Sequence, residues 1–470
     1  MYYKNMSKSK SVVSIGSRLE MLVDDWLIED QQNLTLQLTA PQREEIVWVN
    51  EAPCEGATSC YFNVIQDGAL TRLYYRGVDD TSVCYAESKD GIHFERSDLN
   101  LYDFDGNKKN NIVFQGSDEN SFASHNFAPF LDSNPNASEE ERYKAVGGHR
   151  RSDGSGRELY AFSSPDGIHW KKWHDEPIIT AGKFDSLNVV FWDNVAGVYR
   201  CFSRLWIPAD NSAVPVGGVP VNKGLRGIQS CTSSDFLHWS TPQPHQYCGQ
   251  MPPEEFYTNA TIPAPNAPHI LLAFPMRYVG HRQKNDIFGQ DAVCDAVFMS
   301  SRDGVRWDRT FGEAWIRPGL DQRNWTDRSN MTARGIVATS PEEFSVYVSE
   351  HYRWPDNRLR RYSIRRDGFA SLRAGAQRGE WTTRPLTFTG KQLQLNYSTS
   401  AAGSIQVEVQ NEAGVPLPGF ELEQSKVLFG DELDAIVCWK NGNDLSALQN
   451  QPVRFRFVMR DADLYAVRVG

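Results

Sequence analysis

Three carboxylates in the sequence each lie just ahead of a strand-like, apolar run. Glu55 lies in CEGATSCYFNVI, Asp185 in FDSLNVVFWD and Glu255 in EEFYTNATIP. Carboxylates that meet in one pocket can cleave a glycosidic bond, because one protonates the leaving oxygen while another activates water or attacks the sugar. A third carboxylate nearby can raise the pKa of the acid by like-charge repulsion. We therefore predict that Glu55, Asp185 and Glu255 are catalytic.

Two of these assignments have rivals in the sequence. Glu254 directly precedes Glu255 and is the alternative for the acid. Four other carboxylates could take the place of Glu55, and these are Asp24 and Asp25 in LVDDWLIED and Asp79 and Asp80 in RGVDD.

Other polar side chains lie at equivalent places and could hydrogen-bond sugar hydroxyls. TDRSNMTARGIV, which opens the last of these segments, holds Asp327, Arg328 and Asn330, and SEHY follows one strand later. The residues predicted to bind substrate are His125, Asn126, Asn188, Tyr257, Asn259, Arg277, Glu350 and His351.

An eight-residue pattern recurs along the chain and indicates how these segments are positioned. Its copies are ESKDGIHF, SSPDGIHW, TSSDFLHW, SSRDGVRW and the fainter IRRDGFA, with Asp90, Asp166, Asp235, Asp303 and Asp367 spaced 76, 69, 68 and 64 residues apart. Regular spacing of this kind is typical of a repeat fold. The pattern itself is a turn, since Asp can accept hydrogen bonds from the backbone ahead of it and Gly tolerates a positive φ. We expect these aspartates to be structural.

Each repeat carries short strands rich in aromatic and β-branched residues, such as RLYYRG followed by TSVCYAES. A repeat of roughly 65 residues with three or four strands matches one blade of a propeller. The sequence therefore predicts a five-bladed β-propeller over residues 45–372. The candidate acids precede the innermost strand of each blade, so they should converge at one end of the propeller axis.

The two ends of the chain have a different character. After residue 373, segments such as GSIQVEVQNEAG alternate apolar and polar residues, which predicts a C-terminal β-sandwich over 373–470. Residues 1–44 include EMLVDDWLIEDQQNLTLQLTA and are apolar enough to pack on the propeller or the sandwich, closing a blade or bridging to the sandwich. The predicted fold class is all-β.

Composition argues against several classes of partner. The 470-residue chain has a net charge of -10, whereas a nucleic-acid partner would need a clustered basic face. The sequence contains no run of about 20 apolar residues, so no membrane span is predicted.

The N-terminus lacks a signal peptide, so we expect a cytoplasmic protein as the sequence stands, or a secreted or periplasmic one if a leader was removed. The eight cysteines form no C-x-x-C pair, and no phosphate-binding or dinucleotide motif is present, so no metal site or cofactor is predicted.

Three segments carry a resemblance to a known group of enzymes. HNFAPF resembles the H-x-W-A-P opening of glycoside hydrolase family forty-three, FDSLNVVFWD resembles its I-D-P-x-V-F-x-D strand, and EEFYTNATI resembles the strand that carries its acid. The chain thus resembles the five-bladed propeller glycoside hydrolases, which include families thirty-two, forty-three, sixty-two, sixty-eight and one hundred and seventeen. It also resembles uncharacterised bacterial proteins described as similar to the N-terminal domain of family thirty-two.

The resemblance covers about two-thirds of the chain and implies roles for two acids. Asp185 would be the pKa-tuning aspartate, and Glu255 or Glu254 the acid. The family's first carboxylate is an Asp in a D-P context, whereas Glu55 lies in CEGAT, and the W-M-N-D-P-N-G signature of the fructosidases is absent. Relatives also hold a cation on the axis, so a structural or axial cation is possible here.

We therefore predict an exo-acting glycoside hydrolase that removes a terminal furanoside, pentoside or anhydro-sugar from an oligo- or polysaccharide. The alternatives are a non-catalytic carbohydrate-binding propeller and a relative that transfers the sugar to another acceptor. Converging acids favour the hydrolase, because a binding module needs hydroxyl-bonding groups and aromatic rings rather than three carboxylates. Carbohydrate is the only partner predicted, and the sequence does not determine the oligomeric state.

Overall fold

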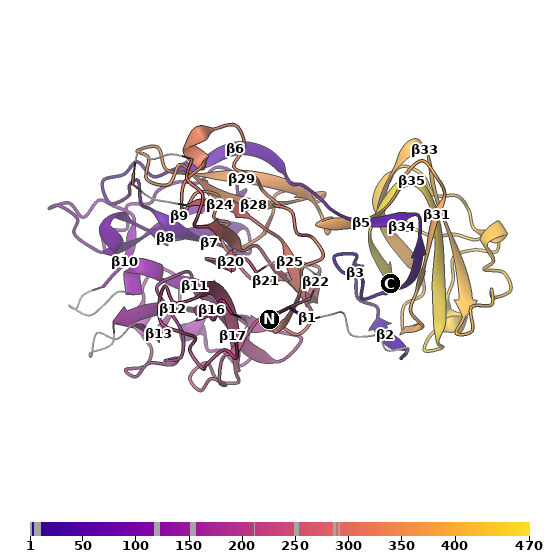
Figure 1. Cartoon of the computed structure of the whole chain (residues 1–470), viewed down its shortest axis with the longest axis horizontal. Helices are drawn as coiled ribbons and strands as arrows, with labels where there is room; N and C mark the ends of the chain where they lie inside the picture. Colours follow the sequence, from indigo (N-terminus) through magenta and orange to yellow (C-terminus); the bar gives the residue numbers. More distant parts are fainter. Residues whose placement is uncertain are drawn as a thin grey trace. The chain divides into compact units, whose positions relative to one another are not determined.

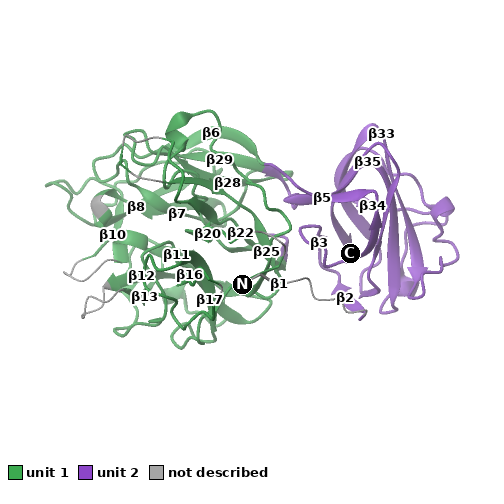
Figure 2. Ribbon diagram, in the orientation of Figure 1, with its two compact units in different colours: residues 1–3, 41–264, 268–363 green, residues 4–40, 265–267, 364–470 purple. Residues whose placement is uncertain are grey.

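The structure, a computed structural model, describes residues 2–3, 11–116, 123–150, 157–210, 212–248, 253–284, 288–289 and 292–470. These residues form strands and short 3-10 helices without any α-helix, in agreement with the predicted all-β class. No helix in this part of the chain is long and apolar enough to cross a membrane. The chain divides into a first unit of residues 1–3, 41–264 and 268–363 and a second unit of residues 4–40, 265–267 and 364–470 (Figure 2).

Three consecutive four-stranded sheets occupy the first part of the first unit. In each, four strands that follow one another in sequence pair in that same order, antiparallel to their neighbours. Sheet one contains β7 (Cys60–Asp67), β8 (Leu70–Arg76), β9 (Ser82–Ser88) and β10 (Ile112–Gln115). Sheet two contains β11 (Ala128–Leu131), β12 (Tyr143–Arg150), β13 (Arg157–Ser164) and β14 (Lys171–Lys172). Sheet three contains β15 (Val189–Asp193), β16 (Val198–Ile207), β17 (Leu225–Ser233) and β18 (Gln243–Pro244).

Sheet four is more elaborate. Its main strands are β21 (Ile262–Ala264), β22 (Ala267–Ala273), β25 (Met299–Ser301) and β26 (Arg306–Asp308), and β19 (Gln246–Cys248) and β1 (Tyr2–Tyr3) add to its edge in parallel. A second small sheet contains β20 (Glu255–Phe256), β23 (Met276–Val279) and β24 (Val293–Ala296). Along the chain, β23 follows β22 and β24 precedes β25, with only a short break between the strands of each pair.

Sheet five joins segments from distant parts of the sequence. It contains β27 (Val337–Ala338), β28 (Glu343–Glu350), β29 (Arg358–Arg365) and β6 (Gln42–Val49). The indigo strand β6 lies beside the orange strand β29, with Trp48 opposite Leu359 (Figure 1). A strand from before sheet one therefore completes the last sheet of the unit.

The recurring octapeptide forms the same turn in four of its five copies. In the second copy, Asp166 Oδ1 accepts the backbone N–H groups of Ile168 and His169 at 2.8 Å each, and Ser164 Oγ accepts that of Gly167 at 2.9 Å. Asp90, Asp235 and Asp303 accept the equivalent pair of N–H groups. These bonds confirm that the four aspartates are structural. The fifth copy has Arg365 in place of Ser, and Asp367 instead accepts a hydrogen bond from Asn266 at 2.9 Å.

Four of these turns also contact the sheet that precedes their own. Tyr74 of β8 donates to the carbonyl of Gly167 at 3.0 Å, and Ser230 of β17 to that of Gly304 at 2.8 Å. The equivalent contacts are Tyr347 of β28 to the carbonyl of Gly91 at 2.6 Å and the ring of Phe130 in β11 against Phe236. The turns thus link sheets one to four in sequence order, and the turn of sheet one contacts sheet five.

The second unit is built from both ends of the chain. The early strands β2 (Val13–Gly16), β3 (Glu20–Met21), β4 (Ile28–Gln32) and β5 (Leu34–Leu38) pair with β30 (Ala370–Ala374), β31 (Gly379–Thr383), β32 (Leu386–Phe388) and β35 (Val453–Val469). The long strand β33 (Leu393–Asn411) pairs with β35 and with β34 (Asp431–Ile436). Buried and half-buried residues alternate along β35, so one of its faces covers an apolar core in which Trp381 stacks on Phe457 at 4.5 Å.

We expect Gly167→Ala to destabilise the first unit. Gly167 has φ +77°, and a Cβ there would lie 2.6 Å from the Tyr74 hydroxyl. Gly197→Ala is the matched control, because Gly197 has φ +67° but no atom within 4 Å of the added Cβ. Both changes cost about 1–2 kcal/mol of left-handed backbone strain, and the clash adds to this only at Gly167. Calorimetric melting should show a larger drop in Tm for Gly167→Ala, and equal drops would contradict the docking role of this turn.

Candidate active site

The segments that open sheets one to four meet in the first unit. The hydroxyl of Tyr61 lies 3.2 Å from that of Tyr257 and donates to the carbonyl of Asp185 at 3.3 Å. His125 Nε2 lies 3.2 Å from the same carbonyl, and Ser186 Oγ donates to the carbonyl of Tyr257 at 2.8 Å. The structure therefore brings together three of the residues singled out in the sequence, His125, Asp185 and Tyr257, with Tyr61 between them. We call the side chains gathered here the junction cluster.

Asp185 presents a charged carboxylate to solvent. Its side chain is 45% exposed, whereas that of Arg204, with which it forms an ion pair, is 5% exposed. Burial raises the pKa of Asp185, but the charge and hydrogen bond of Arg204 outweigh it and lower this pKa below its usual value. Asp185 Oδ2 accepts no hydrogen bond from the described residues, so an ionised oxygen is available to a ligand.

Asp80 joins the same cluster through His125. It ends the 3-10 helix η1 (Val78–Asp80), and its carboxylate lies 2.9 Å from Arg76 Nη1 and 2.9 Å from His125 Nδ1. Burial raises the pKa of Asp80, but the hydrogen bond with His125 and the charge of Arg76 lower it to about 2. With a side chain that is 38% exposed, Asp80 is a second ionised carboxylate within reach of solvent.

Glu55 occupies a different environment. Its side chain is fully buried, where it accepts hydrogen bonds from Tyr75, from Arg96 Nη2 at 2.8 Å and from Asn111 Nδ2 at 3.1 Å. These partners belong to the packing around sheet one, and no face of the carboxylate reaches solvent. Of the carboxylates that the sequence left open for the first sheet, the structure places Asp80 in the cluster and Glu55 in the interior.

The neighbouring glutamates differ in the same way. Glu255 Oε2 lies 2.6 Å from Arg226 Nη1, while Oε1 accepts no hydrogen bond within the described residues. Both oxygens of Glu254 are held, one by Arg277 at 2.7 Å and the other by Arg309 at 2.5 Å, and the Arg309 side chain is fully buried. One oxygen of Glu255 is therefore open to a ligand, while both oxygens of Glu254 are held by arginines.

Glu255 lines a cavity of about 840 Å³. Its walls include Tyr278, Cys294 and Trp325. Three further carboxylates also line it, namely Glu254, Asp295 and Glu313. Arg277, predicted to bind substrate, lines the cavity too, although its guanidinium is engaged by Glu254 and by Asp295 Oδ2 at 2.7 Å. A concave site of this size, bordered by carboxylates and aromatic rings, suits a small sugar.

Three asparagines predicted to bind substrate are buried scaffold residues. Asn126 Nδ2 and Asn188 Nδ2 donate to the carbonyl of Ser186 at 2.8 and 3.0 Å. Asn259 Oδ1 accepts the N–H of Thr261 at 3.1 Å. All three are at most 2% exposed, so they fix the backbone that carries Asp185 and Tyr257 rather than contact a ligand.

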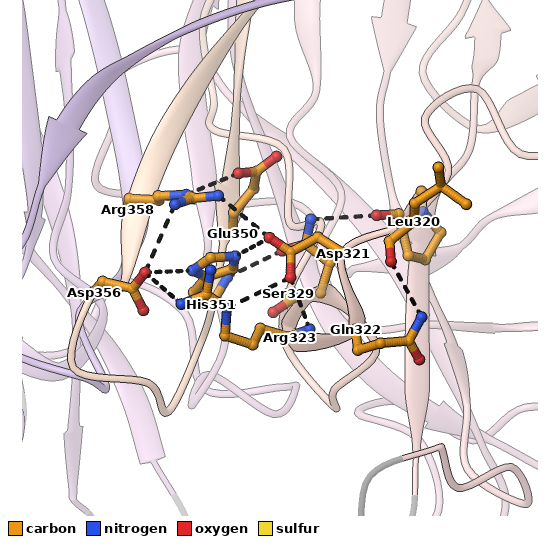
Figure 3. A network of polar contacts seen from close by, with 12 residues as sticks. Leu320, Asp321, Gln322, Arg323, Ser329, Glu350, His351, Asp356 and Arg358 are labelled. Atoms are coloured by element: carbon orange, nitrogen blue, oxygen red, sulfur yellow. Dashed lines mark hydrogen bonds and ion pairs between the residues drawn. The ribbon is translucent and has the colours of Figure 1, made fainter.

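Glu350 and His351, also predicted to bind substrate, belong to a buried polar network (Figure 3). Glu350 is 1% exposed and accepts hydrogen bonds from Arg358 Nε at 2.9 Å and Arg360 Nε at 2.8 Å. His351 is fully buried between Asp321 at 2.7 Å and Asp356 at 2.9 Å. This network ties the turn at residues 321–324 to the loop after β28.

Sequence reasoning missed the arginines of the junction cluster. Arg76 ends β8, Arg204 lies within β16 and Arg226 lies within β17. A basic residue inside an otherwise apolar strand, as in YYRG and CFSRLW, was the available signal, because such a charge is buried only where it has a partner. Tyr352, whose hydroxyl accepts from Arg328 Nη1 at 2.9 Å, was missed as well.

Several residues around the cluster adopt left-handed backbone conformations. The φ angles are +57° at Tyr61, +61° at Asp80, +44° at Ala260 and +75° at Arg353. Residues with a side chain rarely adopt such angles unless the surroundings impose them. Ten other non-glycine residues of the described chain share this conformation.

No group of three or more His, Cys, Asp or Glu side chains is arranged to hold a metal ion in the part of the chain that the structure describes. The axial or structural cation suggested by the resemblance stays a prediction.

No protein-family model matches the chain, and no curated protein matches it. An N-acetylgalactosamine deacetylase from F. plautii, solved with blood group B trisaccharide, superposes with a TM-score of 0.46 at 11% identity, over 70% of this chain and 95% of its own. An α-L-arabinofuranosidase from Fusarium graminearum (TM-score 0.41, 11% identity, 69% and 98% covered) and an α-L-arabinanase from Penicillium chrysogenum (0.38, 12%, 70% and 98%) are also similar. Because these TM-scores are below 0.5, we infer the function from the side chains of the site.

The hydrogen bonds of His351 make the stability of the fold depend on pH. Burial raises the pKa of Asp321, but the hydrogen bond from His351 and the backbone N–H of Arg323 lower it to about 2. A lowered pKa stabilises the fold above the unfolded value of about 4, and this contribution is lost as the pH falls toward 2. We expect Asp321→Asn to cost about 2 kcal/mol at pH 7 and to flatten the loss of stability between pH 4 and 2. Denaturant unfolding at a series of pH values measures both effects, and parallel curves for the two proteins would contradict this role.

Proposed function

We propose that this protein is an exo-acting glycoside hydrolase whose active site is the junction cluster together with the adjoining cavity. The observation that carries the proposal is that three carboxylates from different sheets, Asp80, Asp185 and Glu255, each have an arginine partner and a solvent-exposed side chain. Carboxylates buried for stability alone do not need access to solvent. By contrast, Glu55 and Glu350 have buried side chains that are paired with arginines, as expected for carboxylates that only stabilise the fold.

The roles follow from the environment of each acid. Glu255 borders the cavity with one oxygen uncommitted, so it donates the proton to the leaving oxygen. Asp80, whose pKa is held at about 2, is ionised throughout the working pH range and activates water or attacks the sugar. Asp185, also ionised, supplies negative charge close to the oxocarbenium-like transition state.

The proposed architecture is a five-bladed β-propeller followed by a β-sandwich. Sheets one to five would be the blades, and β6 would close the ring as the outer strand of blade five. The contacts of four octapeptide turns with the preceding sheets, from Tyr347 with Gly91 to Ser230 with Gly304, support this arrangement. The axial end of such a propeller forms a pocket, which favours removal of a terminal furanoside, pentoside or anhydro-sugar over cleavage within a chain.

We expect Glu255→Gln, Asp185→Asn and Asp80→Asn each to reduce kcat by roughly 10²–10⁴-fold. Asp185→Asn and Asp80→Asn should also lower Tm, because the buried Arg204 and Arg76 lose their charged partners, so kcat is compared for the folded variants. The assay is hydrolysis of aryl arabinofuranoside, xyloside, fructofuranoside, galactofuranoside, fucoside and hexuronides, with NMR of the first product to assign the anomeric outcome. Glu139→Gln is the matched control, because Glu139 is exposed on a short 3-10 helix away from the cluster.

Glu254→Gln separates the two neighbouring glutamates. We expect it to lower Tm, because Arg277 and the buried Arg309 lose their shared partner, while the folded protein keeps its kcat within about 10-fold. If Glu254→Gln abolished turnover in a folded protein while Glu255→Gln did not, the acid would be reassigned. Binding of sugars without any turnover would favour the carbohydrate-binding alternative.

A further inference from the structure

The arginines of the junction cluster outnumber the carboxylates that balance them. Arg76 pairs with Asp80, Arg204 with Asp185 and Arg226 with Glu255. In addition, Asp327 is held through both oxygens by Arg353, at 2.9 and 3.1 Å. Each of these four carboxylates therefore already has its own arginine.

Arg328 has the weakest carboxylate contact of these arginines. Its Nε forms an ion pair with Asp327 Oδ2 at 3.7 Å, beyond hydrogen-bond distance, and it shares this carboxylate with Arg353. Its close polar contact is the hydroxyl of Tyr352 at 2.9 Å, and its side chain is 29% exposed. An arginine that shares one carboxylate with a second arginine keeps donors and part of its charge for an anionic ligand.

The tyrosines around Arg328 do not supply the missing negative charge. The guanidinium carbon lies 5.6 Å from the ring centre of Tyr257 and 5.5 Å from that of Tyr352. Burial raises the pKa of Tyr61 and of Tyr352, so both phenols stay protonated at neutral pH. These rings offer hydroxyl groups, while the carboxylate near Arg328 is that of Asp327, which Arg353 also holds.

The ring of Tyr278 connects the cavity with Arg328. Tyr278 lines the cavity that Glu255 borders and stacks on Tyr257 at 6.2 Å between ring centres. The ring centre of Tyr257 in turn lies 5.6 Å from the Arg328 guanidinium carbon. A sugar in the cavity could therefore contact Tyr278 while a substituent extends toward Arg328.

We propose that the terminal sugar bound by this protein carries an anionic group, a carboxylate or a sulfate ester, and that Arg328 binds this group. This inference rests on the proposed function, since it takes the ligand of the site to be a sugar. It changes the expected substrate from a neutral sugar to a uronic acid or a sulfated sugar. Bidentate pairing of the planar guanidinium with two oxygens of the anion would orient the sugar toward the three carboxylates.

Titration calorimetry on the full-length protein tests the proposal without requiring turnover. The probes are glucuronate, galacturonate and galactose 6-sulfate, each compared with glucose and galactose. We expect at least one acidic sugar to bind 10-fold or more tightly than its neutral counterpart, with an affinity that falls as salt is added. Tighter binding of the uronates would identify a carboxylate ligand, and tighter binding of the sulfate would identify a sulfate ester.

Variants of Arg328 test whether this residue causes the preference for acidic sugars. Arg328→Met should abolish the preference for the acidic sugar. Arg328→Lys keeps the charge but loses the planar guanidinium that can pair with two oxygens, so it should retain part of the preference. Arg378→Met is the matched control, because Arg378 is 60% exposed in the second unit. Equal binding of acidic and neutral sugars, no binding of any probe, or an unchanged preference in folded Arg328→Met would each overturn the proposal.

The same experiment separates this proposal from the glycosidase proposal. Tight binding of an acidic sugar that depends on Arg328, with no hydrolysis of any aryl glycoside including the hexuronides, would refute the hydrolase while the anion site stands. Hydrolysis of neutral glycosides, lost in Glu255→Gln and unaffected by Arg328→Met, would refute the anion site while the hydrolase stands.

Discussion

The hydrogen bonds of one aspartate side chain at the end of each third strand underlie the arrangement of the first unit. In four sheets, this carboxylate accepts two successive N–H groups and so turns the chain within three residues. The turn then presents a carbonyl or an apolar side chain to the preceding sheet, as Gly167 does to Tyr74. A local bond thus produces a contact between sheets, and repetition of that contact sets the order of the sheets in space.

The site depends on this arrangement because its residues come from the openings of different sheets. Asp185 has the correct neighbours only when sheet three packs between sheets two and four, where Asn126 and Ser186 tie the segments together. The buried asparagines are as necessary as the acids, since they satisfy carbonyl groups that would otherwise be buried without partners. Tyr61 and Asp80 keep a left-handed backbone because the packing of these hydrogen-bonded segments restricts the conformations open to the chain.

Ion pairing gives the site its chemical character. Each accessible acid has one arginine partner and one side open to solvent, and for Asp80 and Asp185 the arginine helps to keep the carboxylate charged. The acids of the scaffold are bound on all sides, as Glu254 is by Arg277 and Arg309. The surplus arginine, Arg328, departs from this pattern, and for this reason its position suggests a role in recognition.

The sequence by itself determined the features that depend on short-range bonds. The all-β class, the repeat and the structural role of Asp90, Asp166, Asp235 and Asp303 followed from strand patterns and from a turn whose donors and acceptors lie within five residues. The sequence also identified Asp185, His125 and Tyr257, which the structure brings together. Only the tertiary structure showed that Asp80 and Glu255 have accessible side chains while Glu55 is buried and Glu254 is held by two arginines. It also showed that Asn126, Asn188, Glu350 and His351 are buried. The exposure of a carboxylate is decided by residues such as Arg96, 41 positions from Glu55, or Arg309, 55 positions from Glu254, and only the folded chain places those partners.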